Sequence, residues 1–340
     1  MEYYISTVLV YLAVYALGAW ALNLQFGLGG IVNFAFIVFE AVGAYVAGVM
    51  SLGSSGASLG ITYIWGAKLP FPLPLLAGAV AGGLVALVIG PATMRKMRRD
   101  YQAAAMLVVA IILNQVVTNA KGIFNGAEGL AGVPSPLSQY FSASTYPWLY
   151  VIWGLFLMLI VYLFLQRLGR SPFGRTLRAI RDDEAAAVAL GKNPWATRMT
   201  VFVIGGVIGG LAGGLLMEYI GAWGTSAWGY QETFVLVVAV VFGGIGNQRG
   251  ALIGAALVGV ILLQLTLFLP PVGYPGLINS LQWVVIGAAW LVVLWFRPDG
   301  ILPERAFLGL SRKGRLDFRR GASGSAGEMD QRGEKAVSVG

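Results

Sequence analysis

The sequence predicts an all-α, polytopic membrane protein with about nine transmembrane helices. Of its 340 residues, 57% are hydrophobic and only 11% are charged. Apolar runs close to 20 residues long recur along most of the chain, and a helix needs about 20 apolar residues to cross a bilayer. The chain has no Cys and no His. Disulfides, thiol nucleophiles, imidazole bases and His-ligated metal sites are therefore excluded, and we expect neither a catalytic centre nor a metal site.

Nine apolar spans are expected, and the possible range is 8–10 because two of them carry polar or charged side chains. The second span is interrupted by Glu40, and the seventh opens on Gln231 and Glu232. Either of these spans could be a re-entrant or broken helix rather than a full crossing. The expected spans are 4–25, 31–50, 72–93, 102–120, 147–166, 199–217, 229–246, 251–270 and 278–296.

The connections between spans predict the orientation, because Lys and Arg near helix ends are retained on the cytoplasmic side. All but two of the 23 basic residues fall in alternate connections, at 95–99, 167–198, Arg249 and after Trp295. Lys68 and Lys121 alone lie on the opposite side. The pattern predicts a protein of the plasma (inner) membrane with its amino terminus outside and its carboxyl terminus in the cytoplasm. It also explains the net charge of +8 without nucleic-acid binding.

The chain divides into two regions by composition. Residues 1–303 are expected to form a transmembrane domain that contains a charged cytoplasmic segment at 167–198. Residues 304–340 are rich in Gly, Ser and charge, with almost no large apolar residue after Phe318. Such a segment buries too little surface to order itself, so we expect a disordered cytoplasmic tail. Contact of its basic residues with anionic lipid head groups is the alternative.

Glycines are concentrated where close helix packing is expected. Two series with a four-residue repeat run side by side through 205–214, and transmembrane helices associate by close backbone approach at such small residues. A second cluster lies in GGIGNQRG, which lacks the GK[ST] ending and the βαβ context of a phosphate-binding loop. Helix packing is therefore expected at both places. The glycines assigned to it are Gly205, Gly209, Gly213, Gly243, Gly244 and Gly246.

The charged segment contains a predicted amphipathic helix over about 175–190. Leu177, Ile180, Ala187 and Leu190 fall near one face, and Gly191 followed by Asn193-Pro194 provides a stop. The charged residues would be exposed and could contact a partner, whereas a solvated helix without a partner is the alternative. The residues assigned to this contact are Arg178, Arg181, Asp182, Asp183, Glu184 and Gly191.

Polar side chains inside spans are candidates for a pathway through the membrane, because an ionised group at the bilayer centre costs about 2.5–3.5 kcal/mol or more and tends to face protein or water. For the amides the alternative is an interhelical hydrogen bond, and for Glu40 it is a protonated or helix-paired structural role. Glu218 and Glu232, near span ends, are expected at the interface. The pathway candidates are Asn33, Glu40, Asn114 and Gln115.

Several motifs, in the order of one family, extend from about 95 to 303. They are RRDYQAAAMLVV, NGAEGLAGVP, GRTLRAIRDDEAAAVALGKNPWATRMTVFVIGGVIGGLAGGL, FGGIGNQRGALIGA and WFRPDGIL. Together they resemble LivM-type permeases, the membrane subunits of branched-chain amino acid ABC importers. The segment GLGGIVNFAFIVFEAVGAYVAGV keeps that family's GAY ending, while its NFA element is similar to the partner permease of the LivH type.

The resemblance implies transport without chemistry in this chain. The expected partners are a second permease subunit of the LivH type, two cytoplasmic ATP-binding subunits, an extracytoplasmic solute-binding protein and membrane lipid. ATP and Mg²⁺ would bind in the partner ATPase, so no cofactor is expected here. Residues 175–191 would sit in a groove of the ATPase. The solute would be a branched-chain amino acid, or a related small polar molecule such as urea or a short amide. The alternative is an ion-coupled secondary transporter that needs no ATPase.

Overall fold

The computed structural model is helical wherever it is described, apart from connecting segments and two isolated β-bridges. It describes residues 2–53, 61–94, 99–138, 141–142, 145–262, 277–296 and 300–304. Within these residues, six helices are long and apolar enough to cross a membrane, and three shorter apolar helices accompany them. The predicted all-α membrane class is therefore confirmed, whereas nine crossings are not established. The last part of the predicted span 251–270 and all but Glu304 of the predicted tail lie outside the described residues.

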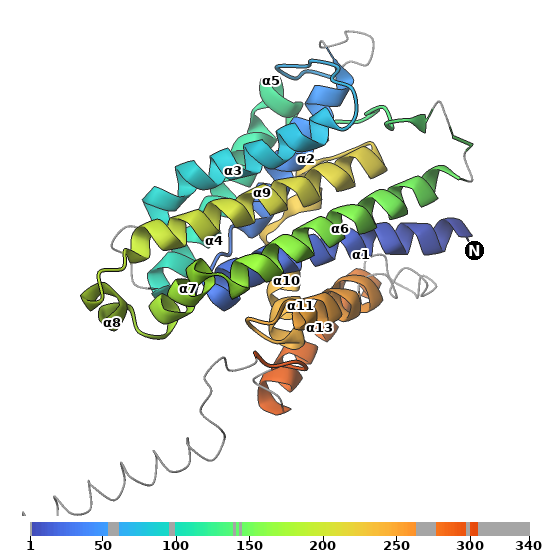
Figure 1. Ribbon diagram of the computed structural model, residues 1–340. Helices are drawn as coiled ribbons and strands as arrows, with labels where there is room; N and C mark the ends of the chain where they lie inside the picture. The colour runs from blue at the N-terminus through green and yellow to red at the C-terminus, as the bar shows by residue number, and fades with distance from the viewer. Residues whose placement is uncertain are drawn as a thin grey trace, which may run out of the picture. The chain divides into compact units, whose positions relative to one another are not determined.

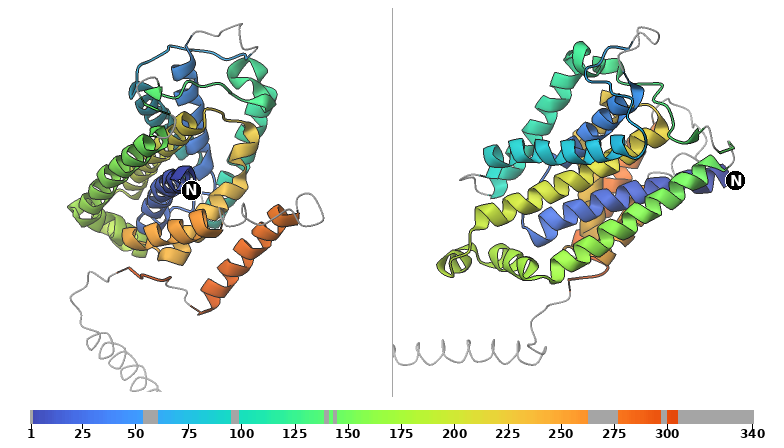
Figure 2. Two further views of the ribbon diagram at one scale, coloured as in Figure 1. Left: turned by 90° about the vertical axis from the view of Figure 1, so that its right-hand side faces the viewer. Right: turned by 45° about the horizontal axis from the view of Figure 1, so that its top comes forward.

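The first helix is surrounded by other helices. α1 (Glu2–Asn23) is continued by a π-helical turn, η1 (Leu24–Leu28). Its sequence is apolar on all sides, which is typical of a fully buried helix, and nearly every side chain from Val10 to Leu28 is buried. In the left view of Figure 2, which looks nearly along α1, the green, yellow and orange helices stand around it. These are α6 (Tyr146–Arg170), α9 (Pro194–Ile220) and α10 (Tyr230–Gly243), all of which contact α1.

The most extensive helix packing joins α9 to α2 (Phe36–Leu52) and α3 (Leu73–Met94) (Figure 1). The two glycine series of α9 divide between these neighbours. A Cβ atom at Gly213 would overlap the backbone carbonyl of Glu40 on α2, and one at Gly210 would overlap the backbone of Gly78 on α3. Glycine is therefore required at both faces, because the three backbones are in direct contact.

The charged segment leaves the end of α6, which runs beside α1 along most of its length (Figure 1). Two short helices, α7 (Pro172–Asp182) and α8 (Glu184–Ala189), then lead into α9. On the other side of the molecule, the connections after α4 pack on the segment before α10, where Leu130 and Trp223 form a β-bridge. The elements there are α4 (Arg99–Asn119), α5 (Lys121–Phe124), η2 (Gly126–Glu128) and η4 (Thr225–Trp228).

The second glycine cluster forms a tight turn after α10. Gly244 and Gly246 have φ angles of 120° and 81°, a region that favours glycine. The closing motif of the chain pairs with this turn, because the amide of Leu302 donates to the carbonyl of Gly243 at 2.9 Å. The remaining helices are α11 (Gln248–Gly254), η5 (Ala255–Leu262) and α13 (Leu277–Phe296).

The two spans that carry acidic residues form short helices. α2 has 17 residues and α10 has 14. At about 1.5 Å per residue α2 rises about 26 Å, less than the roughly 30 Å hydrocarbon core of a bilayer. α10 follows the short helix of Thr225–Trp228, and the segment Thr225–Gly243, with 19 residues, is one of the six long apolar ones. Glu40 lies inside α2 without interrupting it, and Glu232 lies in the first turn of α10.

We expect Gly213→Ala to lower the stability of the protein by about 1–3 kcal/mol, because the added methyl group would force α9 and α2 apart. Gly287→Ala in α13 is the matched control, since no atom lies within 4 Å of its Cβ position. There Ala should be neutral or slightly stabilising, as it favours helix over Gly. Thermal unfolding of both variants in detergent would test this, and equal midpoints would show that the close contact is unimportant.

Candidate functional site

The charged segment folds into two helices instead of the single predicted helix. Ser171 caps α7, and Asp183 takes an extended conformation (φ −147°, ψ 103°) that ends it. The Asp183 side chain then caps α8 by accepting a hydrogen bond from the amide of Ala186 at 3.0 Å. The single helix over 175–190 was therefore wrong, because an Asp at this position competes for backbone donors and begins a new helix.

Gly191 ends α8 with a Schellman motif. Its φ angle is +75°, its amide donates to Val188, and the amide of Lys192 donates to Ala187. The predicted stop at Gly191 thus has a conformational cause. Of the apolar residues predicted on one face, Leu177, Ile180 and Ala187 are buried, whereas Leu190 is 80% exposed beyond the end of the helix.

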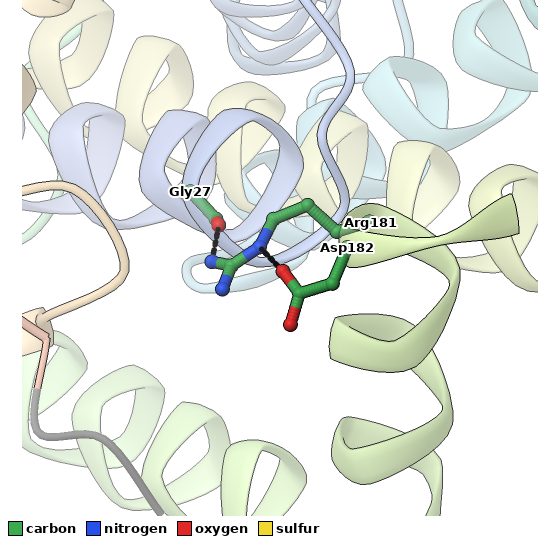
Figure 3. Close-up of polar contacts among 3 residues, drawn as sticks. All are labelled: Gly27, Arg181 and Asp182. Carbon is green, nitrogen blue, oxygen red and sulfur yellow. Dashed lines mark hydrogen bonds and ion pairs between the residues drawn. The ribbon is translucent and has the colours of Figure 1, made fainter. Parts of the chain in front are cut away.

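Two of the three arginines of α7, Arg178 and Arg181, contact backbone carbonyls of the protein. The Arg181 guanidinium donates through Nη1 to the carbonyl of Gly27 in η1, and its Nε contacts Asp182 at 3.1 Å (Figure 3). Arg178 donates to the carbonyl of Gly169 at the end of α6 at 3.0 Å. Both side chains are half-buried, so the prediction that they are exposed was wrong. They are attracted to the carbonyl groups that helix ends leave without partners.

The exposed part of the segment is a tip formed by residues 182–190, which we call the coupling tip. Asp182, Asp183 and Glu184 are exposed as predicted. Val188 is also 52% exposed, in addition to Leu190. Glu184 forms an ion pair with Arg198 at 2.8 Å, which ties α8 to α9. An apolar patch beside a group of acidic side chains is a surface suited to a protein partner.

The glycine turn after α10 is fixed to the same end of α1 that Arg181 contacts. The Asn23 side chain accepts a hydrogen bond from the amide of Gly246 at 2.8 Å, and the Trp20 indole donates to the carbonyl of Gln248 at 2.7 Å. The end of α1 with η1 therefore holds both the glycine turn and the coupling segment. None of these contacts was predicted from the sequence, because a backbone carbonyl gives no sequence signal.

The predicted pathway residues are not brought together. Asn33 is buried and donates to Gln25 at 2.8 Å, so it fixes the turn before α2. Asn114 donates to the carbonyl of Thr225 at 3.0 Å, the interhelical type of hydrogen bond kept as the alternative. Gln115 is exposed on the other face of α4. Of the four candidates, Glu40 lines a cavity.

This cavity has a volume of about 170 Å³ and lies between α1, α2, the end of α9 and the start of α10. It has room for several water molecules, since each takes about 30 Å³. Two carboxylates, Glu40 and Glu232, line it together with aromatic and aliphatic side chains. Tyr11 and Tyr15 were missed, although their four-residue spacing on one span places them on the same helix face. Trp223, in a connecting segment, gave no signal.

Glu218 lies elsewhere. It is fully buried at 0% exposure, and neither of its carboxylate oxygens has a hydrogen-bond partner. α6 covers α9 on this side, and the hydroxyl of its Tyr150 donates to the Glu218 carbonyl at 3.1 Å. The position of Glu218 at the membrane interface stays a prediction.

A helical membrane protein with a connecting segment that ends in an exposed tip and with a cavity between its helices has the features of a transport subunit. The sequence matches the family described as branched-chain amino acid transport system / permease component over residues 4–294. The chain belongs to this family, and the resemblance inferred from its motifs is confirmed. No solved structure matches the chain.

Curated relatives carry both permease names. A Methanocaldococcus jannaschii protein named probable branched-chain amino acid transport permease protein LivM is 26% identical, covering 89% of this chain and 94% of the relative. The Salmonella typhimurium high-affinity branched-chain amino acid transport system permease protein LivM is 26% identical, over 85% of this chain and 68% of its own. The LivH protein of that organism is 28% identical over 85% of this chain and 91% of its own.

We expect Gly191→Ala to loosen the end of α8 by about 1–2 kcal/mol, because a left-handed conformation is unfavourable for a residue with a Cβ atom. Gly191→Asn should cost less, since Asn tolerates this conformation. Gly169→Ala is the control, as its Cβ position meets Leu28 at an ordinary 3.9 Å. Amide hydrogen exchange over 184–192 would measure the effect. Equal protection from hydrogen exchange in all three variants would show that the conformation of Gly191 does not matter.

Proposed function

We propose that this chain is a membrane-spanning permease subunit of an ABC importer that carries branched-chain amino acids across the inner membrane. The observation that carries the proposal is the family match over 4–294, in a chain whose coupling tip presents Val188, Leu190 and three acids to a partner. ATP, with Mg²⁺, would be bound and hydrolysed in two cytoplasmic partner subunits. An extracytoplasmic binding protein would deliver the solute. Urea or short amides are the alternative solutes.

The coupling tip is the proposed contact with the ATPase. It contains α8 and follows directly on α7. Arg181, the residue before the tip, donates to the carbonyl of Gly27 at the end of α1. A displacement of the tip would therefore be transmitted directly to α1, and through the contact of Arg178 with Gly169 to α6. Movement of rigid helices around a fixed site is how alternating access is achieved. Gly191 would act by setting the chain direction after α8, and Asp182, Asp183 and Glu184 by contact with the partner.

The second permease subunit is proposed to be of the LivH type. Salmonella typhimurium has relatives with both names, each described as a branched-chain amino acid permease protein. We further propose about nine crossings, with the three shorter apolar helices completing the six long ones. Residues 1–303 would form the permease domain, and 304–340 a disordered tail on the cytoplasmic side near membrane lipid. The amino terminus would then lie outside.

The ion-coupled secondary transporter is the second candidate. It would use buried carboxylates such as Glu40 or Glu232 for coupling, and it would need no ATPase. The coupling tip has no role in that mechanism, and the family match does not favour it. Association with an ATPase separates the two candidates.

The proposed orientation predicts opposite labelling of two single-cysteine variants, and the chain has no native Cys. Ser138→Cys and Ala185→Cys both replace exposed residues. A membrane-impermeant maleimide added to intact cells should modify the first and spare the second. Lysed cells should show both modified, which controls for reactivity. The reverse pattern would place the coupling tip outside and rule out its contact with a cytoplasmic ATPase.

We expect Ala187→Pro to abolish solute-stimulated ATP hydrolysis and transport while leaving the permease folded. The amide of Ala187 donates to the Asp183 carbonyl at 3.2 Å, and Pro in a helix interior costs about 3 kcal/mol. Asp183→Lys should have a similar effect, because it removes the α8 cap and reverses an exposed charge. Hydrolysis, transport and co-purified ATPase should be measured in one preparation.

Ala185→Pro is the matched control for the broken helix. Ala185 lies in the first turn of α8, where the backbone amide has no intrahelical partner and Pro is tolerated. This variant should keep most of its activity. Transport at the wild-type rate in Ala187→Pro, or failure of any ATPase to associate with the intact protein, would favour the secondary transporter.

A further inference from the structure

In the part of the chain that the structure describes, the cavity between α1, α2, α9 and α10 is lined by acidic side chains without a basic one. Two carboxylates, Glu40 and Glu232, contribute to its wall, and no Lys or Arg is present among the described residues that line it. An isolated buried carboxylate is unfavourable unless a cation or a hydrogen-bond donor compensates for it. The described lining residues supply no positive charge, so a bound ligand would have to supply it.

Glu40 lines the cavity, and one of its carboxylate oxygens has no hydrogen-bond partner. It is 6% exposed, and its Oε1 atom is buried without a hydrogen-bond partner. Gly18 on α1 makes the space for this oxygen, since a Cβ atom there would lie 2.6 Å from it. The absence of a side chain on Gly18 thus lets the Glu40 carboxylate pack against α1 at the edge of the cavity.

The rest of the wall suits an aliphatic amine. Val14, Ile37, Leu216 and Leu236 supply apolar surface, and Tyr11, Tyr15 and Trp223 supply aromatic surface, which attracts ammonium groups. Trp223 is 5% exposed, and its indole N–H is buried without a partner. The indole N–H can only donate a hydrogen bond, for example to an oxygen of a solute, and as a neutral group it cannot neutralise a carboxylate.

From this arrangement we infer that the cavity is the solute-binding chamber of the permease and that it recognises the ammonium group of an aliphatic amine, held between Glu40 and Glu232. The solute's carboxylate contributes little to binding there. The inference rests on the proposed function and goes beyond it, because it states which group of an amino acid the permease recognises. A solute without an amine would leave two carboxylates uncompensated.

Competition binding to the complete transporter tests the inference. The permease complex with its ATPase subunits is placed in lipid nanodiscs without the binding protein, and bound radiolabelled L-leucine is measured. L-Leucinamide keeps the amine and lacks the carboxylate, whereas 4-methyl-2-oxopentanoate keeps the carboxylate and lacks the amine. We expect leucinamide to displace leucine and the oxo acid to compete at least tenfold more weakly. Equal competition by the two, or no specific leucine binding, overturns the inference.

Two variants and one control locate the site. Glu40→Gln and Glu232→Gln should each weaken leucine binding at least tenfold, because each removes a charge that pairs with the ammonium group. Glu218→Gln should bind like the wild type, since Glu218 is a buried carboxylate without a hydrogen-bond partner that does not line the cavity. Size-exclusion profiles and ATPase content establish that the variants are folded. Wild-type affinity in both cavity variants overturns the inference.

The outcome can be separated from the fate of the proposed function. If no ATPase associates with the wild-type permease, the importer assignment itself fails. In the other case the ATPase associates and its hydrolysis responds to the loaded binding protein, while the two analogues compete equally and the cavity variants bind leucine like the wild type. The importer assignment then stands, and only the recognition of the amine in this cavity is wrong.

Discussion

Direct backbone contact at glycine is the constraint on which the rest of the structure depends. Transmembrane helices gain little from hydrophobic burial against one another, so they need closely fitting surfaces. Gly213 of α9 lies against the backbone of Glu40 on α2, and Gly18 of α1 lies against the carboxylate of the same residue. Glu40 is therefore placed by glycines on two different helices. A larger residue at either position would move the carboxylate or the helix that carries it.

The same helix links the cavity to the coupling tip. α1 carries Tyr11 and Tyr15 in the cavity wall, and its π-helical extension carries the Gly27 carbonyl that Arg181 contacts. Twelve residues separate Tyr15 from Gly27, about 18 Å of helix. A buried helix of this length moves as a unit, because its side chains are close-packed on all sides. The extension is a π-helical turn, a feature that is frequent at functional sites.

Sequence reasoning succeeded where the signal is local and failed where it depends on the fold. The membrane class followed from composition, and the stop at Gly191 followed from the glycine and the Asn-Pro that comes after it. The exposure of Arg178 and Arg181 was predicted wrongly, since their partners are backbone carbonyls on other helices. Asn33 and Asn114 could not be distinguished from pathway residues, because an amide that binds a solute and one that fixes packing look the same in sequence. The cavity required residues from four separated segments, so no spacing rule could assemble it.

Basic and acidic side chains lie in different parts of the protein. Basic residues are concentrated between the long helices and near their ends, while Glu40, Glu218 and Glu232 lie within helices. A buried carboxylate without a partner costs several kcal/mol, so such residues persist where a ligand offsets the cost or where neighbouring helices can absorb it. Glu218 fits the second case, because it is enclosed by α9 and α6 away from the cavity. Glu40 lines the cavity, where the ligand that we infer would offset the cost. If the cavity holds an ammonium group as we infer, water that enters it would weaken the pairing with the carboxylates, because two charges attract each other less in water than in a dry interior.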